Sequence, residues 1–190
     1  MFNKKISTAI TGSLFAIGLT LSSQAMAAFT AQEAAELDAE AAATLQSFLT
    51  SAKGADGVFA NAKGILVCPK IRKAGLGVGA ERGKCVLTKG FDGKLYYLSS
   101  GLKAGAIIGA SSHSMILVLN SDEALAKFTS GKREWELGVD ASVAVAKVGA
   151  GGDLDTTNLK KDIVSFMFGE KGLIADVTFE GSRFKKLDVE

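Results

Sequence analysis

The fold is decided by the stretch GILVCPKIRKAGLGVGAERGKCVL, which covers residues 64–87. Short apolar runs alternate in it with glycine-bearing segments, a pattern typical of strands joined by tight turns. Runs of this kind occupy residues 65–68, 76–79, 85–87, 95–98, 106–108 and 115–119. The chain has 22 glycines and one proline, which favours strands that bend sharply or approach other backbone closely. We therefore expect a mainly antiparallel, glycine-rich sheet or barrel.

Helices are predicted at the start and in the middle of the chain, which makes the fold class α+β. Thr30 and Glu33 have the spacing of a capping box, and apolar residues then recur every three or four positions up to Leu49. This pattern predicts an N-terminal amphipathic helix with an acidic outer face that docks on the core. Ser121 or Asp122 could cap one short internal helix that ends near Phe128.

Two longer strands are expected in the second half of the chain. Apolar and small or polar residues alternate from Trp135 to Ala146 and again from Leu173 to Glu180, with the period of two that a strand requires. The glycine-rich segment 149–153 between them is predicted to be a loop.

Residues 1–27 have the build of a secretory signal peptide. Lys4 and Lys5 precede an apolar run that ends in Ala25-Met26-Ala27, and the run is too short and too polar for a permanent membrane span. Cleavage after Ala27 would leave a single domain, residues 28–190, in the periplasm or outside the cell. No cysteine stands at the cleavage point, so a lipid anchor is not expected.

The charge balance argues against nucleic acid as a partner. The whole chain has 22 basic and 20 acidic residues, and the predicted cleavage removes two lysines and no acid. The remaining chain is formally neutral, whereas nucleic-acid-binding domains are usually strongly basic.

Four blocks of sequence, in order, resemble the SYLF-domain family. They are Gly64–Lys70 with Lys73–Gly75, Gly77–Gly79 and Gly83–Leu87; Ile108–Ser112 leading into Met115–Leu119; Gly138–Ala144; and Lys171–Ala175 with Glu180–Ser182. The resemblance implies a lipid-binding module without enzymatic activity or cofactor. Eukaryotic relatives engage phosphoinositides, membranes and in some cases actin, while bacterial relatives are secreted or envelope proteins.

Two motifs suggest chemistry that their surroundings do not support. Gly75–Gly79 lacks the spacing and the following helix of a dinucleotide-binding loop. His113 lies among serines, but neighbouring residues of a strand point to opposite faces, and no nucleophile elbow is present. One histidine and two distant cysteines also make a poor zinc site. No catalytic residue and no metal ligand is therefore assigned.

Cys68 and Cys85 are the only cysteines, and in an exported protein they would tend to oxidise. The sequence leaves two alternatives open, a disulfide or two buried thiols on strands that never meet.

Five cations close together are the candidate lipid-binding residues: Lys70, Arg72, Lys73, Arg82 and Lys84. Such a cluster could attract anionic headgroups, or it could be a solvated edge that prevents strand aggregation. A secondary basic patch comprises Arg183, Lys185 and Lys186, with Phe184 either inserting into a membrane interface or packing in the core. The expected partners are anionic phospholipid membranes or lipids. The alternative function is an envelope scaffold or protein-interaction module that recognises a protein partner without binding lipid directly.

Overall fold

The computed structural model describes residues 28–52, 56–60, 62–88, 93–130, 134–136, 144–147, 161–172 and 182–190. The predicted signal peptide, the predicted loop at 149–153 and the predicted strand from Leu173 to Glu180 lie outside these ranges. The elements, in chain order, are α1 (Ala31–Ser51), α2 (Asp56–Phe59), β1 (Gly64–Thr88), β2 (Lys94–Leu119), α3 (Asp122–Thr129), β3 (Glu134–Glu136), β4 (Ala144–Lys147), β5 (Ile163–Gly172) and β6 (Ser182–Leu187).

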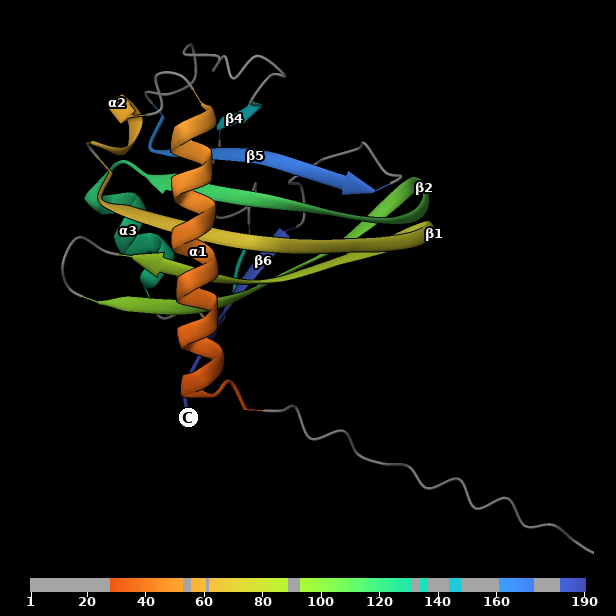
Figure 1. The fold of residues 1–190 in the computed structure, drawn as a ribbon, viewed down its shortest axis with the longest axis horizontal. Helices are drawn as coiled ribbons and strands as arrows, with labels where there is room; N and C mark the ends of the chain where they lie inside the picture. Colours follow the sequence, from red (N-terminus) through yellow and green to blue (C-terminus); the bar gives the residue numbers. More distant parts are fainter. Residues whose placement is uncertain are drawn as a thin grey trace, which may run out of the picture.

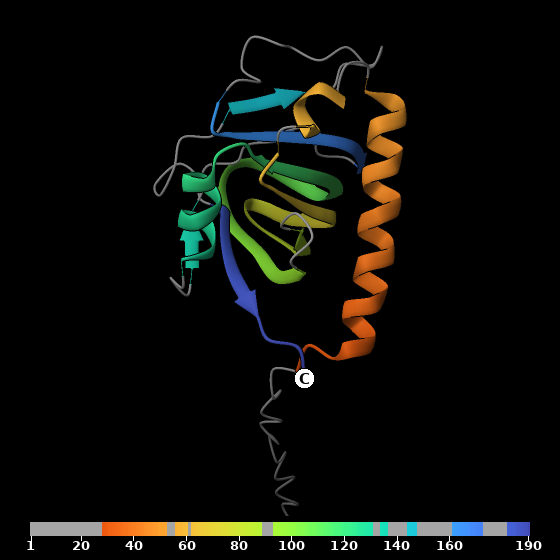
Figure 2. The ribbon, with the colours of Figure 1, turned by 90° about the vertical axis from the view of Figure 1, so that its left-hand side faces the viewer.

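The strands form one sheet that curls into a half-barrel (Figures 1 and 2). Its order is β3-β6-β2-β5-β4, and β1 pairs with β2 along nearly its whole length. Among the described strands, β4 and β5 pair in parallel, and the other pairings are antiparallel. The α+β class and the mainly antiparallel sheet are thus confirmed.

The six short runs predicted in the first half of the chain belong to only two long strands. β1 bends at Gly77, whose φ of 76° is in the left-handed region that favours glycine. A Cβ at Gly75 would collide with the backbone of Gly79, so the bend is tight. The pairing with β2 shifts register between Leu76 and Val78 but resumes on both sides. The glycines therefore bend the paired strands β1 and β2 without ending them. The sequence pattern had instead indicated turns that separate short strands.

The bend divides β1 into a first arm, residues 64–76, and a second arm, residues 78–88, which lie against each other. Cys68 on the first arm and Cys85 on the second form a disulfide with their Cα atoms 4.1 Å apart. A Cβ at Gly83 would lie 2.7 Å from the carbonyl oxygen of Lys70, so the second arm passes close to the first there as well. The disulfide alternative is the one that the structure contains.

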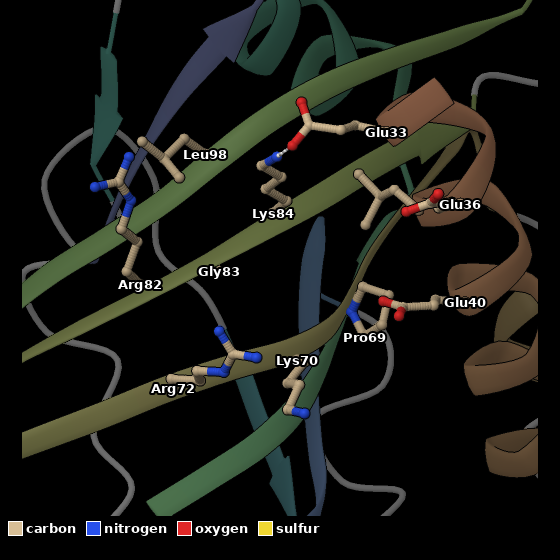
Figure 3. Close-up of a pocket in the computed structure, with 11 residues that line it drawn as sticks. Glu33, Glu36, Glu40, Pro69, Lys70, Arg72, Arg82, Gly83, Lys84 and Leu98 are labelled. Carbon is tan, nitrogen blue, oxygen red and sulfur yellow. Dashed lines mark hydrogen bonds and ion pairs between the residues drawn. The ribbon is translucent and has the colours of Figure 1, made fainter. Parts of the chain in front are cut away.

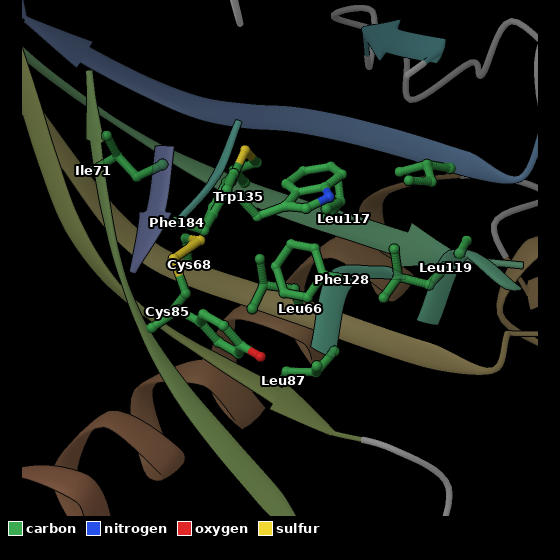
Figure 4. Packing of buried hydrophobic residues seen from close by; sticks show 14 of the residues in the cluster. Leu66, Cys68, Ile71, Cys85, Leu87, Leu117, Leu119, Phe128, Trp135 and Phe184 are labelled. Carbon is green, nitrogen blue, oxygen red and sulfur yellow. A yellow bond between two sulfur atoms is a disulfide. The ribbon is translucent and has the colours of Figure 1, made fainter. Parts of the chain in front are cut away.

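Both faces of the sheet are buried where β1, β2 and β5 run together. Successive residues of β1 alternate between two clusters, with Leu66 and Cys68 in one and Val67 in the other. The first cluster includes the disulfide and the rings of Phe128, Trp135 and Phe184 (Figure 4). The second lies between the sheet and α1 and contains, among others, Ala41, Phe48, Ile116, Val118 and Phe166. Burial on both faces explains why these strands read as continuous apolar runs.

Both predicted helices are present. The Thr30 hydroxyl accepts a hydrogen bond from the Glu33 amide, and the Glu33 carboxylate accepts one from the Thr30 amide, which completes the capping box of α1. Ser121 caps α3 through a hydrogen bond from the Ala124 amide. The α1 helix lies along the outside of the curled sheet, and α3 lies on the other side of it (Figure 2). None of the helices in the described ranges is long and apolar enough to cross a bilayer.

The structure describes only the two ends of the strand predicted from Trp135 to Ala146, because residues 137–143 lie outside the described ranges. Trp135 lies in β3, which pairs with β6, whereas Ala144 and Ala146 lie in β4, which pairs with β5. β3 and β4 are at opposite ends of the strand order. The alternation of apolar and polar residues predicts a strand for each segment, but it does not show with which strand that segment pairs.

Candidate functional site

A cleft of about 500 Å³ lies between α1 and the two arms of β1 (Figure 3). Charged residues form most of its walls, cations on β1 and carboxylates on α1. Its lining residues are Glu33, Glu36, Leu37, Glu40, Pro69, Lys70, Arg72, Arg82, Gly83, Lys84 and Leu98. Four of the five predicted lipid-binding residues thus share one cleft.

The bend of β1 brings these four cations together from two segments of the chain. Lys70 and Arg72 come from the first arm, and Arg82 and Lys84 come from the second. Because residues two apart on a strand share a face, each pair points outward on the same side. Lys70, Arg72 and Arg82 are exposed, and Lys84 is partly buried. Figure 3 shows both arginines on the side of the cleft away from α1.

Lys73 does not belong to this surface. It is the odd-numbered neighbour of Arg72 on the strand, so it points to the opposite face, and it is only 2 % exposed. The prediction that Lys73 contacts headgroups is therefore corrected, because a side chain buried inside the sheet cannot reach a membrane surface.

A carboxylate on α1 neutralises one of the four cations of the cleft. Lys84 forms an ion pair with Glu33, with 2.7 Å between Nζ and Oε1, and its ammonium lies 4.8 Å from the centre of the Phe29 ring. The hydrogen bond from Lys84 and the backbone hydrogen bond from Thr30 lower the pKa of Glu33. This carboxylate therefore stays ionised at neutral pH and holds α1 to the second arm of β1.

The remaining charges of the cleft are not paired with one another. In the part of the chain that the structure describes, Lys70, Arg72, Arg82 and Glu40 make no ion pair and no side-chain hydrogen bond. Glu36 accepts a hydrogen bond from Gln32. With Lys84 and Glu33 neutralising each other, three cations face two carboxylates, so the cleft keeps a surplus of positive charge.

The secondary basic patch lies on β6 and does not join the cleft. Arg183 pairs with Glu136 of β3 at 3.1 Å, and Lys185 and Lys186 are exposed. Phe184 is 1 % exposed and packs against Phe128 and Trp135, with ring centres 5.7 and 6.0 Å away. Of its two predicted roles, Phe184 therefore has the packing role, and insertion of this ring into a membrane is excluded.

The two motifs set aside in the sequence have structural roles. Gly75–Gly79 lie inside β1 at its bend, where no helix follows to complete a nucleotide-binding loop. His113 is buried in β2 opposite Ile71, and its neighbour Ser114 donates a hydrogen bond to the carbonyl oxygen of Pro69. His113 thus lies within the sheet and not at its edge.

Sequence reasoning missed the carboxylates that face the cations. The sequence predicts Glu36 and Glu40 on the outer, solvated face of the helix and assigns Glu33 only to its capping box. Their spacing of three and four residues places them on one stripe of α1, which was a usable signal. What the spacing could not show is that this stripe lies beside the arms of β1.

Comparison with known proteins agrees with the resemblance seen in the sequence. A family model described as Ysc84, Las17-binding protein actin regulator, matches residues 100–188. That range takes in most of β2 and all of β5 and β6, the strands to which the rest of the sheet is attached. Comparison with curated proteins finds no match. Residues 100–188 thus match the Ysc84, or SYLF, domain, which is consistent with the resemblance of the chain to the SYLF-domain family.

Proposed function

We propose that this protein is a non-enzymatic, peripheral lipid-binding protein of the periplasm, and that its cleft-side cations contact anionic headgroups. The observation that carries the proposal is the gathering of Lys70, Arg72 and Arg82 from two arms of β1 on one exposed surface. These three cations have no partner among the described side chains, so their charge is available to a ligand. The match to the SYLF family, which is associated with lipid or actin-related binding, supports the same function.

The electrostatics of the surface favour an anionic bilayer as the ligand. A cation near such a surface contributes about 1 kcal/mol to binding, and this attraction decays within a Debye length of about 10 Å in 0.1 M salt. Arginine also forms paired hydrogen bonds with phosphate oxygens. Two arginines and a lysine on one face therefore suit a row of phosphate headgroups.

The Cys68–Cys85 disulfide supports the proposed location. Disulfides persist in oxidising compartments such as the bacterial periplasm and are rare in the cytosol. The predicted signal peptide points to the same compartment.

Vesicle sedimentation tests the proposal. Residues 28–190 should sediment with phosphatidylcholine vesicles that contain phosphatidylglycerol, and much less with phosphatidylcholine alone. The variant Arg72→Gln/Arg82→Gln should bind the anionic vesicles about 30-fold more weakly at low salt, because two headgroup contacts of about 1 kcal/mol each are lost.

A control with the same change in net charge is Lys127→Gln/Lys161→Gln. Both lysines are exposed and lie outside the cleft. Equal binding of neutral and anionic vesicles, or equal loss in the two double variants, would refute the headgroup contact.

A further inference from the structure

The bent end of β1 carries an exposed apolar tip. Four large hydrophobic side chains are exposed in the described part of the chain, and three of them gather here: Leu76, Val78 and Leu102, which are 79, 66 and 78 % exposed. Leu102 belongs to β2 and pairs with Ala80, two residues beyond Val78. We define the apolar tip as these three residues. The bent end of β1 lies at the side of the molecule away from α1 (Figure 1).

The outward face of β1 has the same order of side chains on both arms. From the cleft to the tip, it consists of Lys70, Arg72, Ala74 and Leu76 on the first arm and of Lys84, Arg82, Ala80 and Val78 on the second. Of the intervening side chains, those of Ile71, Lys73 and Glu81 are buried and so point to the other face. Each arm therefore passes from lysine through arginine and alanine to an aliphatic residue.

We propose that the apolar tip inserts into the outer part of a lipid bilayer while Arg72 and Arg82 bind the headgroups above it. This inference rests on the proposed function and deepens it, since it states how the protein is held at the membrane. Apolar side chains at the end and cations behind them match the order of environments in a bilayer, where hydrocarbon lies below phosphate. A protein partner would not require this order on both arms.

The spacing along the strands fits the thickness of the interface. Arg72 lies four residues before Leu76, and Arg82 lies four residues after Val78. At about 3.3 Å per residue, the arginine backbones are about 13 Å behind the tip. The headgroup region of one leaflet is roughly 5–7 Å thick. An arginine side chain can extend several ångströms toward the tip, so its guanidinium reaches phosphate depth when the aliphatic residues enter the hydrocarbon.

Fluorescence measures the insertion directly. In the variant Leu76→Trp, the new indole should shift to the blue and should be quenched by vesicles of phosphatidylglycerol and acyl-brominated phosphatidylcholine. The native Trp135 is buried in the core and provides a constant background. The control Lys161→Trp, which places the indole on an exposed position outside the cleft and the tip, should show neither effect.

Binding measurements on the full mature chain complete the test. Leu76→Ser/Val78→Ser/Leu102→Ser should weaken sedimentation with the same vesicles at least 10-fold and at high salt as well, because apolar insertion is not screened. The control Val189→Ser removes the fourth exposed aliphatic side chain and should leave binding unchanged.

The possible outcomes separate this inference from the proposed function. If the triple variant binds anionic vesicles as tightly as the unmodified chain, and the Leu76→Trp indole stays in water, tip insertion is refuted while headgroup binding stands. If the unmodified chain binds no vesicles, both tip insertion and headgroup binding are refuted. If the triple variant alters self-association in sedimentation velocity and leaves vesicle binding unchanged, the tip is a contact between copies and the inference is overturned.

Discussion

At the scale of single residues, the Cys68–Cys85 disulfide is the covalent link between the two arms of β1. Both cysteines are fully buried in the cluster on the inner face of the sheet. A link between residues 17 positions apart stabilises a protein mainly by restricting its unfolded chain, by about 3 kcal/mol in the loop-entropy description. The arms carry the cleft cations, so the link also keeps the two halves of the candidate site together.

We expect the variant Cys68→Ala/Cys85→Ala to lose about 3 kcal/mol of unfolding free energy, measured by urea denaturation. Reductant should lower the urea midpoint of the unmodified chain toward that of the variant, and it should not change the variant. An unmodified chain whose thiols are shown to be reduced but whose midpoint stays the same would contradict the prediction.

At the scale of secondary-structure elements, the bend of β1 depends on glycine in a way that can be tested. In Gly75→Ala the new Cβ would meet the backbone of Gly79, which cannot move aside without opening the bend. We expect a loss of unfolding free energy of about 1–3 kcal/mol, the usual cost of overpacking. Gly57→Ala is the matched control, because a Cβ there meets nothing within 4 Å. Thermal or urea denaturation of both variants measures the difference, and equal midpoints would show that the bend tolerates a side chain.

The same glycines explain why the elements were only partly predictable. Helix caps depend on residues three apart, so Thr30 and Glu33 identify the start of α1 directly, and the start of α3 was narrowed to Ser121 or Asp122. Strand boundaries depend on whether the partner strand follows the bend. β2 bends with β1, so pairing continues past Gly77, and this is a property of two segments together.

β5 and β6 were missed for a related reason. The run from Ile163 to Phe168 is buried for most of its length and lacks clear alternation, and the cations of β6 suggested a surface patch. Short apolar runs of this kind do not show by themselves which type of element they form.

At the scale of the whole molecule, part of the candidate site could be predicted from the sequence and part could not. The cations that line the cleft are close together in the sequence, so the cluster was found without a structure. Strand alternation shows which of these cations face outward. It excludes Lys73, which is buried, from the candidate site. The carboxylates on α1 come from a segment about 30 to 50 residues away, and only the docking of the helix brings them to the cleft.

The closeness of α1 to these cations predicts that the helix weakens membrane binding. Glu36 and Glu40 line the same cleft as Arg72 and Arg82 and would be held near the headgroups of an anionic bilayer, which repels them. Charge–charge energies of about 1 kcal/mol at short range in water correspond to about 5-fold in affinity for each carboxylate. Glu36→Gln/Glu40→Gln should therefore bind anionic vesicles up to about 25-fold more tightly at low salt. The gain should shrink as salt shortens the Debye length to about 3 Å near 1 M.

The control for this effect is Asp122→Asn/Glu123→Gln, which makes the same change in net charge on α3. That helix lies on the other side of the sheet from α1 (Figure 2). If both double variants gain equally in vesicle sedimentation, the net charge of the protein sets its affinity and the position of α1 has no part in it. A gain confined to the α1 variant would instead mean that the helix limits the cations of β1 through its place beside them. Movement of α1 away from the arms would then strengthen membrane binding without any change in composition.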